Sequence, residues 1–127
     1  MSSSSSFRNL AVWAKAHHLV LLIYGTTKSF PKDELYGLTS QMRRAAVSVP
    51  ANITEGYKRK GLQEKIRFYN IAQASLEELR YFIILCNDLK YELPNEAEKL
   101  SEEVSKILEV YINRIKESQV GEPDSEY

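Results

Sequence analysis

The chain has little of several residue types, and each scarcity excludes a class of protein. Its 127 residues include one cysteine, Cys86, so an internal disulfide cannot form and a reducing, cytoplasmic setting is expected. Five glycines and four prolines exclude collagen-like and low-complexity chains and are typical of a mostly helical protein. No run of roughly 18 apolar residues is present, so we expect no membrane partner. A chain of this length can bury one hydrophobic core, which predicts one domain.

Both ends of the sequence differ in composition from the middle. The opening Met1 to Ser6 is a serine run without the basic start and apolar stretch of a secretory signal. We expect residues 1–6 to be a disordered tail. Residues 118–127 are polar and acidic, and we expect a second disordered tail there. The folded domain is therefore expected over residues 7–117.

Net charge is zero, but the two halves of the chain have opposite signs. Residues 1–67 hold 11 Lys and Arg against 4 Asp and Glu, a net +7, whereas residues 68–127 hold 6 against 13, a net −7. Two explanations stay open. The halves attract each other within the fold or between subunits, or the basic half presents a face for nucleic acid.

Four segments carry apolar residues at alternating three- and four-residue steps, which predicts four helices. They cover residues 7–28, a stretch from between 33 and 38 to about 61, residues 62–89, and residues 94–117. The first is apolar around much of its circumference, so we expect neighbours on more than one side. Short connections favour antiparallel neighbours. The expected fold is all-α, an antiparallel up-down-up-down four-helix bundle.

Pro50 lies inside the second predicted helix. A proline there lacks the amide donor and crowds the carbonyl of Ala46, four residues earlier. We therefore expect a kink of the second helix at Pro50.

A line of polar side chains accompanies the apolar seam of the second helix. Because its members recur at helical steps, they share one face beside the core. A solvated helix face is one interpretation. We favour a subunit interface, in which Arg43 or Arg44 pairs with an acid and Asn52 bonds main chain opened by Pro50; buried polar groups of this kind fix register more than stability. The candidate interface residues are Gln41, Arg44, Ser48, Asn52, Glu55 and Glu78, the last two being the candidate acids.

Cations cluster where the second helix ends and the third begins. Phosphate binding requires such clusters, and Phe68 and Tyr69 follow closely in the sequence. A solvated helix end is the alternative, and the zero net charge favours it. The candidate nucleic-acid residues are Arg43, Lys58, Arg59, Lys60, Lys65 and Arg67.

No pattern in the sequence indicates catalysis. His17 and His18 are adjacent and point in different directions on a helix, unlike an i, i+4 metal pair. Neither histidine follows a glutamate by three residues, as a di-iron bundle requires. Phosphate-binding glycine loops and nucleophile elbows are also missing. We therefore expect no enzyme, no cofactor, no metal and no small-molecule substrate.

The stretch from Phe30-Pro31 through Gly37-Leu-Thr-Ser-Gln-Met-Arg-Arg-Ala-Ala-Val-Ser-Val-Pro-Ala-Asn-Ile-Thr-Glu-Gly56 resembles the signature of a bacterial four-helix bundle family, the 23S ribosomal RNA intervening-sequence proteins. Trp13 with Ala16, and the stretch Ile71-Ala-Gln-Ala-Ser-Leu-Glu-Glu-Leu79, are similar to the family's first- and third-helix elements, so the resemblance covers about residues 10–91. Val49, Thr54 and Ala74 depart from the isoleucine, alanine and glycine usual at those positions.

The resemblance implies a homo-oligomer, because family members form homopentamers. A relative in the same fold group is the accessory protein of diversity-generating retroelements, a basic pentamer that binds a reverse transcriptase and nucleic acid. We therefore expect a non-enzymatic oligomeric scaffold or adaptor, whose partner is an RNA or a nucleic-acid enzyme. The alternative is a direct RNA-binding protein that recognises structured ribosomal RNA through the basic patch.

Overall fold

A computed structural model describes residues 6–118, so the two expected tails lie outside the described residues apart from Ser6 and Ser118. Within this range the chain is all-helical and has no strand. It forms the 3-10 turn η2 (Phe7–Asn9), helix α1 (Ala11–Thr27), the 3-10 turn η3 (Lys32–Glu34), and helices α2 (Leu38–Lys58), α3 (Leu62–Leu89) and α4 (Asn95–Ser118). The predicted all-α class and the four helices are confirmed.

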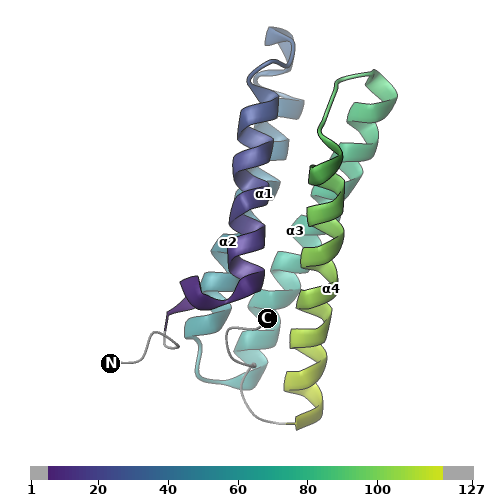
Figure 1. The fold of residues 1–127 in the computed structure, drawn as a ribbon. Helices are drawn as coiled ribbons and strands as arrows, with labels where there is room; N and C mark the ends of the chain where they lie inside the picture. The colour runs from purple at the N-terminus through teal and green to yellow at the C-terminus, as the bar shows by residue number, and fades with distance from the viewer. Residues whose placement is uncertain (1–5, 119–127) are drawn as a thin grey trace.

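The four α-helices lie side by side around a shared core (Figure 1). Helix α1 packs against α2 and α4, and α3 packs against the same two neighbours. The α1–α2 and α3–α4 connections lie at one end of the molecule, and the α2–α3 connection lies at the other (Figure 1). The largest fully buried side chains come from all four helices and include Leu19, Met42, Tyr69, Leu76 and Tyr111.

The first predicted helix, 7–28, is divided into η2 and α1. Leu10 separates them with an extended backbone, φ −79° and ψ 125°, and its side chain is buried in the core. The turn also brings Phe7 back onto Trp13, with 5.2 Å between ring centroids. The helix therefore begins later than predicted because burial of Leu10 and the Phe7 contact both require the bend.

The second helix begins at Leu38, at the late end of the predicted range, and η3 precedes it. Glu34 links this region to the rest of the fold. One of its carboxylate oxygens accepts the Leu38 amide at 3.4 Å, and the other accepts the Tyr91 hydroxyl at 2.9 Å. The side chain of Glu34 thus caps α2 and holds the α3–α4 connection against it.

Helices α2 and α3 approach closely because small residues line their contact. Gly56 is buried, and a Cβ atom built there would lie 2.6 Å from a ring carbon of Tyr69. Farther along the seam, Ser48 and Ser75 bring their hydroxyl oxygens to 2.8 Å. Pro50 is buried inside α2, which continues to Lys58. The kink at Pro50 stays a prediction.

Candidate functional site

The polar line of α2 divides into an exposed part and a half-buried part. Gln41, Arg44 and Glu55 are exposed, whereas Ser48 and Asn52 lie half-buried at the α2–α3 seam. Asn52 Nδ2 donates to the Ser48 carbonyl at 2.8 Å and to the Ser48 hydroxyl at 2.9 Å. The two residues therefore form a polar contact within one chain.

The acceptor of Asn52 corrects one detail of the prediction. Pro50 leaves the carbonyl of Ala46 without its amide donor, and Asn52 was expected to bond main chain opened in this way. The side chain of Asn52 instead reaches back one helical turn to Ser48. Asn52 lies six residues after Ala46 but only four after Ser48, and its side chain is short. The carbonyl within its reach is therefore that of Ser48.

Two of the four residues proposed for ion pairs across an interface have partners within the chain. Glu55 pairs with Arg59 at 2.6 Å. Arg43 donates from Nε to the Thr27 hydroxyl at 2.9 Å and lies over the Tyr24 ring.

The other two, Arg44 and Glu78, are exposed, and neither forms an ion pair within residues 6–118. They carry opposite charges. Their pairing between subunits stays a prediction.

Sequence reasoning missed an apolar groove between α1 and α2, which we call the α1–α2 groove. One hollow of about 610 Å³ is lined by residues that include Tyr24, Leu35, Tyr36 and Val47, with Arg43 and Arg44 at its margin. A second, of about 350 Å³, is lined by Trp13, Pro50 and, again, Val47, so the two adjoin. The sequence did show that the first helix is apolar around much of its circumference. It did not show which part of that helix its neighbours leave exposed.

Large exposed apolar side chains are distributed unevenly over the described residues. Four of the ten line the α1–α2 groove: Tyr24, Leu35, Tyr36 and Val47. Leu21, on α1, is exposed but does not line it. Four lie on the side of α3 that faces away from the core: Ile71, Tyr81, Ile84 and Leu89. We call this side, together with Glu78, the α3 outer face. Helix α4 contributes only Val110, and its exposed side chains are mostly charged.

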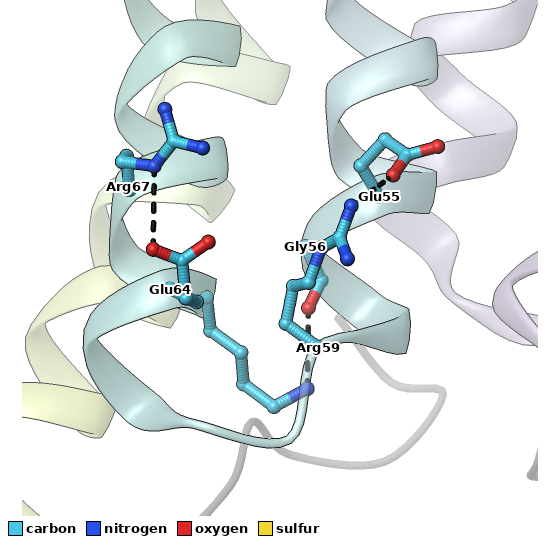
Figure 2. Close-up of polar contacts among 6 residues, drawn as sticks. Glu55, Gly56, Arg59, Glu64 and Arg67 are labelled. Carbon is cyan, nitrogen blue, oxygen red and sulfur yellow. Dashed lines mark hydrogen bonds and ion pairs between the residues drawn. The ribbon is translucent and has the colours of Figure 1, made fainter.

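The predicted cation cluster surrounds the α2–α3 connection, and we call Lys58, Arg59, Lys60 and Arg67 the basic end. All four are exposed. Two are engaged with acids, because Arg59 pairs with Glu55 at 2.6 Å and Arg67 pairs with Glu64 at 3.4 Å (Figure 2). Within the described chain, Lys58 and Lys60 form no ion pair.

Two arginines of the basic end, Arg59 and Arg67, contact the same aromatic ring, that of Phe68. The guanidinium carbons of Arg59, from the end of α2, and Arg67, from α3, each lie 4.7 Å from the centroid of the Phe68 ring. Cation–π contact and the carboxylate partners both restrict the two side chains. The arginines are therefore held in place, whereas the two lysines are not.

Two candidate nucleic-acid residues lie outside the basic end. Arg43 lies at the α1–α2 groove. Lys65 is only 7% exposed, and its ammonium donates to the carbonyls of Gly56 at 3.2 Å and Tyr57 at 2.9 Å. The Gly56 carbonyl also accepts the Arg59 amide at 3.2 Å. A cation suits the negative, carbonyl end of a helix, so Lys65 caps α2 and is not part of the phosphate-binding surface.

The described residues bring no three His, Cys, Asp or Glu side chains together as a metal site would require. Over the same range, none of the helices is long and apolar enough to cross a membrane. Cys86 is buried, with its sulfur 3.5 Å from that of Met42, and burial raises the pKa of its thiol to about 11. The thiol therefore has little of the thiolate form that nucleophilic chemistry needs.

The described fold and its surfaces define an all-α protein whose distinctive features are two exposed apolar regions and a basic end. The comparison with protein families agrees with the resemblance found in the sequence. The model of the 23S rRNA-intervening sequence protein family matches residues 8–113, and the chain belongs to this family. The match extends from η2 into α4, beyond the region that carried the resemblance. No curated protein matches the chain.

Proposed function

We propose that this protein is a non-enzymatic, homo-oligomeric scaffold or adaptor in the cytoplasm, serving an RNA or a nucleic-acid enzyme. The proposal includes the up-down-up-down course of the helices, the kink at Pro50, and the pentamer that the family resemblance implies. One observation carries it. Eight of the ten large apolar side chains that the described residues expose lie on two surfaces, and Leu21 and Val110 lie elsewhere.

Association explains this distribution better than chance exposure does. Single apolar side chains are common on protein surfaces, but contiguous apolar regions usually mark contact with a partner. The exposed side of α4 carries charges instead, as a face in water should. The unpaired Arg44 and Glu78 add charges of opposite sign beside the apolar regions. Of the six predicted interface residues, Gln41, Arg44 and Glu78 are exposed and form no ion pair within the described chain.

Measuring the mass by size-exclusion chromatography with light scattering tests the proposal. A mass near five times the protomer mass of 14.6 kDa is expected. If Arg44 and Glu78 pair between subunits, Arg44→Glu and Glu78→Arg should each lower the mass, and the double variant should restore it. Glu109→Arg on α4 is the matched control and should keep the wild-type mass. A wild-type monomer at high concentration would overturn the proposal.

Direct binding of structured ribosomal RNA is the second candidate function, and the basic end favours it. Two unpaired lysines and two held arginines gather at one end of the protomer, which is the arrangement that phosphate contacts require. Repetition of this cluster in an oligomer would add to the affinity.

The salt dependence of RNA binding tests this second candidate. Affinity for a structured ribosomal RNA fragment should fall steeply with salt, with a log–log slope of about −0.9 for each phosphate contacted in a duplex. Lys58→Glu with Lys60→Glu should weaken binding and reduce the slope. Lys99→Glu with Lys106→Glu, on the charged side of α4, should have a smaller effect. Equal affinity in all three proteins would exclude the basic end as the RNA-binding surface.

A further inference from the structure

We infer that the α1–α2 groove of one copy of this chain receives the α3 outer face of a second copy. The inference rests on the proposed homo-oligomer and identifies the two surfaces that join. The groove is hollow and apolar, and its walls include Tyr24 and Val47. The α3 outer face instead presents side chains that can fill a hollow, since Tyr81 and Ile84 are each 56% exposed.

The charges of the two surfaces are complementary. Arg43 and Arg44 stand at the margin of the groove, and Arg43 is held there by Thr27 and Tyr24. The α3 outer face carries Glu78, which has no ion pair within residues 6–118. Contact between the surfaces would bring Arg44 close to this carboxylate. An exposed ion pair contributes little affinity, but it fixes orientation and excludes like-charged contacts.

A second copy is the occupant because the chain itself carries the matching surface. Both surfaces also contain apolar side chains that are otherwise left in water, including Tyr36, which is 93% exposed. Docking would cover both at once. Helix α4, with its charged outer side, takes part in neither surface and stays in solvent.

The geometry makes the contact heterologous, meaning that two different surfaces meet. In a symmetric pair each surface would meet a copy of itself, which would place groove against groove. Here each copy offers one groove and one α3 outer face, so every added copy leaves one of each open until a ring closes. Self-association by this contact therefore ends in a closed ring when the rotation between neighbouring copies closes, and continues as an open filament when it does not.

Two variants, each of which blocks one surface, test the inference. Val47→Glu places a charge in the middle of the groove, and Ile84→Glu places one on the α3 outer face. Both positions are exposed, so each variant should keep its helical circular dichroism and thermal unfolding. Each should run as a monomer in sedimentation velocity. Val110→Glu, a change of an exposed apolar residue on α4, is the matched control and should keep the wild-type mass.

Mixing the two variants distinguishes a heterologous contact from a symmetric one. The intact α3 outer face of the Val47→Glu protein can enter the intact groove of the Ile84→Glu protein. The mixture should therefore form a complex of two protomers and stop there. If the mixture stays monomeric, the heterologous contact is refuted.

The same measurements separate failure of this inference from failure of the proposed function. If the wild-type protein is an oligomer and both single variants keep its mass, the surfaces are assigned wrongly while the homo-oligomer stands. If the wild-type protein is a monomer, the proposed homo-oligomer fails and the inference fails with it.

Discussion

Replacing Gly56 with alanine should destabilise the protein, although the same change usually stabilises a helix. An added Cβ would lie 2.6, 2.8 and 3.1 Å from three carbons of the Tyr69 ring. That ring is fully buried, and its centroid lies 5.8 Å from that of Tyr111, so it cannot move aside without disturbing the core. The gain from the helix is about 0.5–1 kcal/mol. Overpacking costs about 1–3 kcal/mol, so the net loss should be about 1 kcal/mol.

Gly25 provides the control for this experiment. It also lies in a helix, α1, but nothing lies within 4 Å of the Cβ that alanine would add. Gly25→Ala should therefore gain about 0.5 kcal/mol from reduced backbone entropy. In thermal unfolding recorded by circular dichroism, the midpoint temperature of Gly56→Ala should be about 4 °C lower than that of the wild type, and that of Gly25→Ala should be slightly higher. All samples must have the same protein concentration because association shifts the midpoint.

A double-mutant cycle links the effect to its cause. Tyr69→Leu removes the ring atoms that the new methyl group would meet. In that background, Gly56→Ala should lose most of its penalty and approach the gain seen at Gly25. If Gly56→Ala stabilises the original protein as much as Gly25→Ala does, the close approach of α2 and α3 is refuted.

Three further predictions follow from single side chains. The Cys86 thiol, with its pKa raised to about 11 by burial, should not react with a thiol reagent at pH 8 until urea unfolds the protein; immediate reaction in the native state would contradict its burial. The hydrogen bond that Tyr91 donates to Glu34, followed by desolvation, raises the pKa of the Tyr91 hydroxyl, so the folded state favours the neutral phenol. That contribution to stability is complete below the ordinary tyrosine pKa near 10 and is lost as the pH rises above it. The difference in unfolding free energy between the wild type and Tyr91→Phe should therefore shrink as the pH rises above about 10. A difference that stays constant with pH would show that the Tyr91 hydroxyl does not couple stability to pH. Lys65→Met should lower the unfolding free energy by about 1–3 kcal/mol because two main-chain carbonyls lose a charged donor, whereas Lys60→Met should change it little in the same urea titration.

The helices could be predicted from the sequence because their apolar spacing is a local property. Helix α3 occupies Leu62–Leu89, the predicted range, with Gly61 preceding it. The two 3-10 turns were not predictable in the same way. The bend at Leu10 and the start of α2 depend on contacts with residues distant in the chain, such as the bond between Tyr91 and Glu34, separated by 57 positions. Spacing along one helix carries no information about such contacts.

The candidate site was predictable only in part for a related reason. The spacing of polar residues on α2 placed them on one face, but it could not show what that face contacts. Ser48 meets Ser75 of the same chain, whereas Arg44 remains exposed. The groove was harder still, since it exists only where two helices and the connection before α2 leave a gap. Its lining includes Pro50 and Val47, which on α2 alone are ordinary apolar residues.

The opposite charges of the two halves support a directional assembly. If the halves neutralised each other within the protomer, ion pairs should join them closely. Within the described residues, the pair of Lys15 with Glu103 joins the halves at a long 3.7 Å, and both side chains are exposed. The contact of His18 with Glu96, at 3.6 Å, is an ion pair only when the imidazole is protonated. Shorter pairs, such as that of Arg59 and Glu55, lie within one half. Residues 6–61, which include α1 and α2, hold 9 Lys and Arg against 3 Asp and Glu, whereas residues 62–118, which include α3 and α4, hold 8 against 11. The first pair of helices is therefore on the positive side of the protomer and the second pair is on the mildly negative side. Two copies attract when the first pair of helices of one faces the second pair of the other, which is the orientation that brings groove and α3 outer face together.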